Sequence, residues 1–258
     1  MKSCRLCLFV LWISMASIAQ VAVRHQEGLV HGFLALRTLE GETLADGDLM
    51  QTARSDRVTS RLVFHFKDGS LHDETAVFSQ RGHFRLISDH LIQKGPAFKH
   101  PIDMTVNAKR GNVSVRYTED GKEKTADDHF DLTNAGNGLQ LTLLKNILPD
   151  TPETKVAFVV ATPKPQLVTL VIKPQAEEPF STGDARRKAV HFVVKVDIGG
   201  ISGVLADLLG KQPPDTNVWI LEGEAPAFVK SEGPLAPGGP VWRIELVNPV
   251  WPSGADSK

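Results

Sequence analysis

The feature that most constrains the fold is an alternation of apolar and polar residues that recurs in short segments along the chain. Between residues 61 and 67, the apolar Leu62, Phe64 and Phe66 would lie on one face of a strand, and the polar Arg61, His65 and Lys67 on the other. Residues 188–198 repeat the pattern, with apolar side chains at every second position. Because successive side chains of a β-strand point to opposite faces, a period of two predicts strands with one buried and one solvated face. Strands of this kind form antiparallel sheets.

Glycine-containing pairs separate the alternating segments in the first half of the chain. Asp-Gly or Arg-Gly pairs occupy residues 68–69, 81–82 and 120–121, and such pairs are typical of hairpin turns. The strands expected between these turns cover residues 61–67, 71–80, 84–92, 104–107, 113–118 and 123–130. The sequence therefore predicts a meander of antiparallel strands.

The second half has two segments whose apolar spacing fits a short helix better than a strand. Residues 138–148 form the first, which ends at Pro149, and residues 201–209 form the second, which lies between glycines. The strands expected around them cover residues 156–161, 167–173, 188–198, 217–221, 227–230 and 241–247. Helices are thus predicted to be few and short.

A sheet with one apolar face and so few helices must curl on itself or pair with another sheet. We predict a mainly β fold, in which a curled antiparallel sheet forms an open half-barrel around one or two short helices. The alternative is a two-sheet β-sandwich. No internal repeat is present, so residues 20–258 are expected to form one domain. Five aromatic residues are expected on the concave face, as core or as ligand-binding surface: Phe64, Phe66, Phe84, Phe192 and Trp242.

The N-terminus has the layout of a secretory signal peptide. Two basic residues precede an apolar run over residues 6–18, and the small Ser17 and Ala19 stand at the −3 and −1 positions of a cleavage site. This run is shorter than the roughly 20 residues that a membrane-spanning helix needs. We predict that residues 1–19 are removed during export to the periplasm or the cell exterior, leaving no transmembrane segment. Both cysteines lie within the predicted signal peptide, so no disulfide is expected.

Nine histidines raise the question of a metal site. In one strand, Asp127, His129 and Asp131 would project from the same face, and all three side chains are competent zinc ligands. His72 is a further candidate, and a two-residue turn at the Asp-Gly pair would place His65 directly opposite it. Polar runs of this kind also form the solvated side of sheets, and no spacing such as HExxH is present. A metal-dependent hydrolase is therefore an alternative hypothesis.

Other chemistry-bearing patterns do not point to an enzyme. The chain has no GxSxG motif, and the glycine-rich residues 199–203 fit neither common phosphate-binding motif. The formal net charge of −1 argues against electrostatic binding to nucleic acid. No cofactor is predicted.

The C-terminal third is distinctive in composition. Three of the four tryptophans and many prolines lie within residues 210–252. Such a region forms either a docking face for an envelope protein or a packed core with Trp219 and Trp242 inside. A protein-interaction module is therefore a second alternative function.

Three segments carry a resemblance to a known group of proteins. They are DGSLHDETAVFSQRG at residues 68–82, NGLQLTLLKNIL at residues 137–148 and WILEGEAPAFVKSEGPL at residues 219–235. The order of elements resembles exported bacterial proteins of unknown function with a lipoprotein-carrier-like (LolA-like) half-barrel. The resemblance implies a curved sheet around a helix, in some members with a cavity for acyl chains. We therefore expect a non-catalytic binding protein of the cell envelope, whose partner is a hydrophobic small molecule or lipid.

Overall fold

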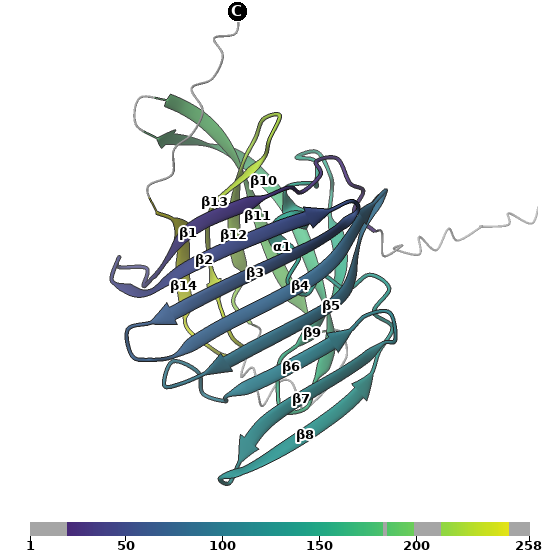
Figure 1. Cartoon of the computed structure of the whole chain (residues 1–258). Helices are drawn as coiled ribbons and strands as arrows, with labels where there is room; N and C mark the ends of the chain where they lie inside the picture. Colours follow the sequence, from purple (N-terminus) through teal and green to yellow (C-terminus); the bar gives the residue numbers. More distant parts are fainter. Residues whose placement is uncertain (1–19, 183–184, 199–212, 248–258) are drawn as a thin grey trace, which may run out of the picture.

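The computed structural model describes residues 20–182, 185–198 and 213–247. The predicted signal peptide and the helix predicted over residues 201–209 lie outside these ranges. The described chain forms fourteen strands and one short helix (Figure 1). The elements are β1 (Val30–Arg37), β2 (Thr43–Arg54), β3 (Arg57–Phe66), β4 (Leu71–Arg81), β5 (His83–Lys94), β6 (Ile102–Asn107), β7 (Asn112–Glu119), β8 (Lys122–His129), α1 (Gln140–Leu144), β9 (Thr154–Val160), β10 (Gln166–Thr182), β11 (Ala185–Asp197), β12 (Thr216–Leu221), β13 (Ala227–Pro234) and β14 (Val241–Leu246).

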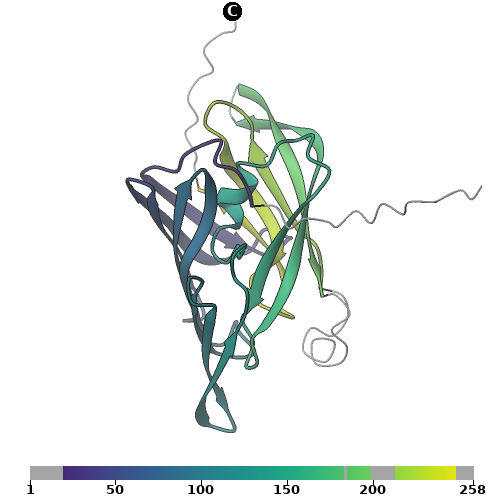
Figure 2. The same cartoon turned by 90° about the vertical axis from the view of Figure 1, so that its right-hand side faces the viewer.

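All fourteen strands belong to one antiparallel sheet. Its order runs from β8 back to β1, then from β14 back to β9, so the first and last strands are neighbours in the middle. The two edge strands, β8 and β9, do not pair with each other, and the sheet is therefore not closed. Figure 2 shows the halves β1–β8 and β9–β14 as two facing walls with α1 between them. The prediction of a curled antiparallel sheet is confirmed at this level, and the two-sheet sandwich is not formed.

The core lies between the two walls. Phe64 of β3 and Phe192 of β11 belong to one cluster of buried apolar side chains, and Leu139, Leu143 and Leu144 from the α1 region belong to it too. The predicted helix within residues 138–148 is present but has only five residues. Among the described residues, no helix is long and apolar enough to cross a membrane. The sheet therefore buries its concave face mainly through its own curvature.

The turn between β3 and β4 is one residue longer than the sequence pattern suggested. Gly69, at φ +83°, donates its N–H to the carbonyl of Phe66 and closes a three-residue loop. The added residue pairs Phe64, rather than His65, with His72. Since a shift of one residue moves every side chain to the opposite face, His72 is buried on the concave side. The predicted arrangement of His65 opposite His72 is therefore wrong.

The two edges of the sheet are protected differently. Residues 134–137 lie along the outer edge of β9, where the side-chain amide of Asn137 both accepts a hydrogen bond from the Val159 N–H and donates one to its carbonyl. The other edge, β8, is exposed and rich in charged side chains. Charges on an edge strand disfavour pairing with another chain.

Two phenylalanines provide a direct test of which side chains face the core and which face solvent. Phe192 is 1% exposed in the core, whereas Phe33 on β1 is 59% exposed. Replacing a buried phenylalanine with alanine removes apolar contacts and leaves a cavity. We expect Phe192→Ala to lower the free energy of unfolding in urea by about 3–5 kcal/mol, and Phe33→Ala to change it by less than about 0.5 kcal/mol. Equal losses for the two variants would contradict the assigned burial.

Candidate functional site

The five aromatic residues predicted on the concave face lie together in the core region. Phe64, Phe66, Phe84 and Phe192 are buried, and the partly buried Trp242 packs against them. The rings of Phe66 and Trp242 have centroids 5.5 Å apart. These aromatic side chains line neither of the two surface hollows described below. In this structure they pack in the same apolar cluster as the leucines of the α1 region.

The predicted metal ligands are only partly brought together. Asp127 and His129 lie on β8 and line an open surface hollow together with Asn112 of β7, whose Oδ1 is 3.2 Å from His129 Nδ1. Asp131 lies beyond the end of β8, where its carboxylate accepts hydrogen bonds from the hydroxyl and N–H of Thr133. Within the described part of the chain, no group of three or more His, Cys, Asp or Glu side chains is arranged to hold a metal ion.

The Trp-rich region forms a second hollow, on the outer face of β10–β14. The ring of Trp219 stacks on His191 at 4.5 Å between centroids, and Lys230 Nζ lies 4.0 Å above the Trp219 ring. Trp219 Nε1 donates to the carboxylate of Glu178 at 2.8 Å. The hollow has a volume of about 390 Å³ and is lined by Glu178, Pro179, Phe180, Ala189, Trp219, Val229, Lys230, Arg243 and Glu245. Its polar groups interact with one another, which leaves few donors or acceptors for a partner.

A third group of polar side chains lies inside the curled sheet, on β4 and β5. His72, Glu74 and Gln80 are separated from the buried Ala76 and Phe78 by even numbers of residues along β4. They therefore share the concave face with them. The sequence analysis left open that His72 lies on the solvated face. The shared parity with Ala76 and Phe78 was the signal that would have placed His72 and Glu74 inside.

Glu74 and Asp89 form a pair of carboxyl groups at the centre of this region. Glu74 pairs in register with Leu91, and Asp89 pairs with Ala76, so the two acids are diagonal neighbours about 7 Å apart. Asp89 is 1% exposed, and neither of its carboxyl oxygens has a hydrogen-bond partner among the described residues. The backbone N–H of the adjacent His90 favours the ionised form of Asp89, but its geometry falls short of a hydrogen bond. None of the ion pairs among the described residues includes either acid.

Burial dominates the protonation of these groups. It raises the pKa of Glu74 to about 7, although the backbone N–H of Gly138 favours the ionised form. The pKa of Asp89 is raised well above its usual range by burial, and the nearby Glu74 charge raises it further. For His72, burial lowers the pKa to about 4, so the ring is neutral at physiological pH. Burial therefore favours the protonated form of both acids over the ionised form.

A two-residue brace lies directly over the carboxyl pair. Gly138 has φ +64°, and a Cβ at this position would stand 2.5 Å from the Ala76 Cβ and 3.1 Å from Asp89 Oδ1. Only glycine fits both the conformation and the close approach. Because Asn137 is bonded to Val159 of β9, residues 137–138 connect the two walls of the sheet.

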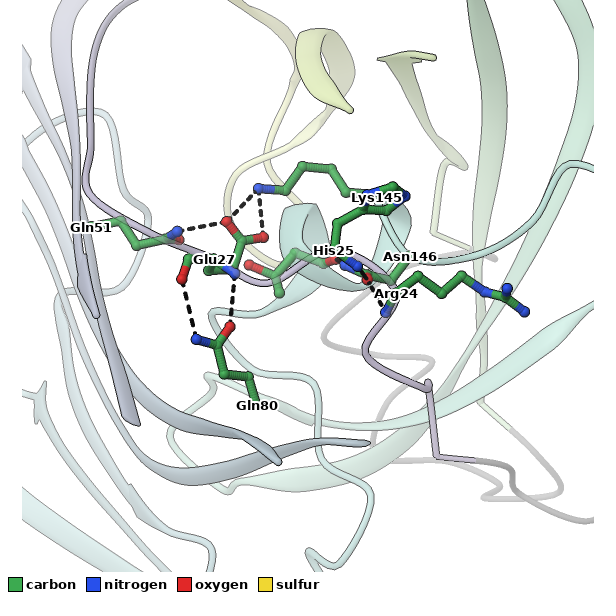
Figure 3. Close-up of polar contacts among 8 residues, drawn as sticks. Arg24, His25, Glu27, Gln51, Gln80, Lys145 and Asn146 are labelled. Atoms are coloured by element: carbon green, nitrogen blue, oxygen red, sulfur yellow. Dashed lines mark hydrogen bonds and ion pairs between the residues drawn. The ribbon is translucent and has the colours of Figure 1, made fainter. Parts of the chain in front are cut away.

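The other end of α1 is held by a compensated polar clamp, drawn in Figure 3. Lys145 forms an ion pair with Glu27, at 2.7 Å from Oε2, and Gln51 Nε2 donates to the same oxygen at 2.6 Å. The side chain of Gln80 binds the backbone of Glu27 through both its oxygen and its nitrogen. Asn146 Oδ1 accepts the N–H groups of residues 24 and 25 at 2.8 Å each. The segment before β1 is thus fastened across α1.

Comparison with known proteins gives a likeness of fold. No family model matches the chain, and no curated protein matches it. The chain is similar to the crystal structure of a β-barrel-like protein of a domain of unknown function (DUF1849) from Brucella abortus. The TM-score is 0.49 at 10% sequence identity, and the match covers 87% of this chain and 99% of that chain.

The buried acid Asp89 predicts a pH-dependent loss of stability. Its folded-state pKa is raised, whereas an unfolded aspartate ionises near pH 4, so the unfolded state loses its proton first and stability falls as the pH rises above about 4. Asparagine does not titrate. We expect Asp89→Asn to be more stable than the wild type at pH 8 by at least about 1 kcal/mol, with little difference near pH 4.

Urea unfolding at pH 4 to 8 measures this effect. The exposed Glu40 lies in the loop between β1 and β2, and Glu40→Gln is the matched control, for which we expect a profile parallel to that of the wild type. His72 titrates in both proteins, so its effect cancels in the comparison. Parallel profiles for Asp89→Asn and the wild type would contradict the assigned burial of the carboxyl.

Proposed function

We propose that this protein is an exported, non-catalytic binding protein of the cell envelope that holds a lipid or acyl chain on the concave face of a half-barrel. The observation that carries the proposal is the way the concave face is covered. One unclosed sheet of fourteen strands encloses a single five-residue helix with its flanking segments. No second sheet lies over this face in the described chain, so one short segment is all that a ligand has to displace.

The apolar contacts of α1 are of the kind that an acyl chain would make. Leu139, Leu143 and Leu144 pack into the same buried cluster as Phe64 and Phe192. The free energy gained by burying apolar surface depends on its area rather than on its chemical identity. A hydrocarbon chain in this place therefore regains most of the stabilisation that the leucines give. The predicted aromatic residues would then line the ligand.

The attachments of α1 suit reversible displacement. The helix is fastened near its ends by hydrogen bonds, each of which makes a modest net contribution to stability, and by the ion pair between Lys145 and Glu27. The edge strands β8 and β9 do not pair with each other, which leaves a seam between the walls. Glu74 keeps partial solvent exposure although it faces the concave side, so water reaches this part of the interior. These features favour entry of a ligand between the walls.

The ionisable groups of the interior favour binding over catalysis. His72 and Asp89 are buried rather than in an open cleft, and Gly138 packs against Asp89. A general acid or base must reach its substrate within hydrogen-bond distance, and these groups are covered in the conformation described. The same positions can contact a ligand that has replaced α1.

Export rests on the sequence pattern of residues 1–19 and is tested by the N-terminus of the protein. When the full chain is expressed in an exporting Gram-negative host, we expect the periplasmic fraction to contain a protein of residues 20–258, identified by intact mass and N-terminal sequencing. Ala19→Arg should block processing, because the −1 position accepts small side chains. A full-length protein retained in the cytoplasm would refute this part of the proposal.

Ligand binding is tested by native mass spectrometry of the protein from that fraction. We expect an adduct of lipid mass that is lost on denaturation, and binding of the neutral probe 1-dodecanol by the delipidated protein. Replacing the clamp in Glu27→Gln/Lys145→Met removes the ion pair and the Lys145 hydrogen bond that fasten this end of α1, so the helix is easier to release. Apparent affinity for the probe should therefore rise about three- to tenfold, since a larger fraction of molecules is open.

The exposed pair Glu153 and Lys155 provides the control for the clamp variant. We expect Glu153→Gln/Lys155→Met to bind dodecanol as the wild type does. A bare polypeptide mass together with no dodecanol binding by any of the three proteins would overturn the proposed function.

A further inference from the structure

We propose that the Glu74–Asp89 pair is a recognition site for an ammonium group, so that the ligand of the concave face is a primary amine bearing an apolar chain. This inference rests on the proposed function and specifies the chemical class of its ligand. It follows from the position of two acids beneath Gly138, from the absence of a hydrogen-bond partner for one of them among the described residues, and from what surrounds them.

The first step is that the pair lacks compensation. Asp89 is 1% exposed with two unpartnered oxygens. Buried carboxyl groups are normally hydrogen-bonded, paired with a cation or bound to a metal. The buried Glu27 follows this rule, because its carboxylate binds both Lys145 and Gln51. The missing component at Asp89 is a donor of hydrogen bonds with positive charge.

The second step is that the local donor is inadequate. The backbone N–H of Gly138 faces Glu74, and the Gly138 Cα packs against Asp89 without giving it a hydrogen bond. A single N–H serves one acid. An ammonium group has three donors and a full charge, and so can bridge both carboxylates when the brace at residues 137–138 moves away.

The third step is that an organic ammonium fits better than a metal ion. The described part of the chain places no third His, Cys, Asp or Glu ligand with this pair. Calcium needs six to eight oxygen ligands and zinc needs about four, so two diagonal carboxyl groups are too few. A primary ammonium is satisfied by two or three acceptors.

The fourth step is that apolar side chains flank both acids. Leu62 and Leu91 are the cross-strand neighbours of Glu74, and Ala76 and Val106 are those of Asp89. A hydrocarbon chain attached to the ammonium group would therefore continue over apolar surface. The same two acids would repel a fatty acid carboxylate placed there, which makes the head group the basis of selectivity.

Calorimetric titration with three probes of equal chain length tests the inference. The delipidated full chain, as purified from the exporting host, is titrated at pH 7 with dodecylamine, 1-dodecanol and dodecanoate below their aggregation concentrations. We expect dodecylamine to bind at least about tenfold more tightly than dodecanol, and dodecanoate more weakly than either. Glu74→Gln/Asp89→Asn should abolish the preference for the amine and leave dodecanol affinity within about twofold.

The variants remain foldable, because they remove two carboxyl groups whose ionisation opposes folding. Thermal unfolding of the double variant, recorded without ligand, should occur at or above the wild-type temperature, and dodecylamine should raise the unfolding temperature of the wild type only. Glu40→Gln, at an exposed position, should keep the preference for the amine.

The outcomes separate the two proposals. Equal binding of amine and alcohol, or a preference for the amine that persists in the double variant, overturns the ammonium site and leaves the proposed function intact. No binding of any probe overturns both. Tight binding of dodecanoate to the wild type also refutes the ammonium site, because it would show that the pair tolerates an anion.

Discussion

The structure depends on burying one long apolar face with almost no helix to cover it. A strongly twisted sheet of more than about ten strands curls or splits, and here fourteen strands curl as one sheet. Register shifts contribute bends at several points, among them the bulges at Val77/Phe78 and Pro174/Glu177. The two walls thereby face each other, and among the described residues one five-residue helix and its flanking segments lie in the core between them. Everything proposed about function concerns what occupies that space.

The same strand shows how the two faces of the sheet treat charge. Asp73 and Glu74 are adjacent on β4 and therefore point in opposite directions. On the convex side, the Arg61 guanidinium holds the pKa of Asp73 below its usual range through hydrogen bonds and charge, although partial burial acts against it. On the concave side, burial raises the pKa of Glu74. Asp103 on β6 repeats the convex arrangement with His90 and Arg116 as partners. Compensation is thus available on the outer face, and its absence at the inner pair is specific to that place.

The sequence was sufficient for features that depend on local pattern and insufficient for those that depend on register. Period-two alternation placed Phe64 and Phe192 on the buried face, and apolar spacing located the helix before Pro149. The Asp-Gly pair predicted a turn, but two-residue and three-residue hairpin loops can both contain such a pair. The loop has three residues, and this difference of one residue places His72 opposite Phe64 on the concave face. The brace between Asn137 and Val159 joins segments that the sheet alone brings together. No sequence pattern in either segment predicts the contact between Asn137 and Val159.

The two ends of α1 differ in how the acids next to them are compensated. At the Lys145 end, the charges of Lys145 and Glu27 compensate each other, and Gln51 also donates a hydrogen bond to Glu27. Moving Lys145 away would leave Glu27 buried without its cation, which is costly. At the Gly138 end, the contact covers two acids that it leaves largely unsatisfied. Movement at this end has to break the two hydrogen bonds between Asn137 and Val159, and it opens the carboxyl pair to a better donor. A ligand that brings a positive charge to Asp89 gains an interaction that the closed form does not contain.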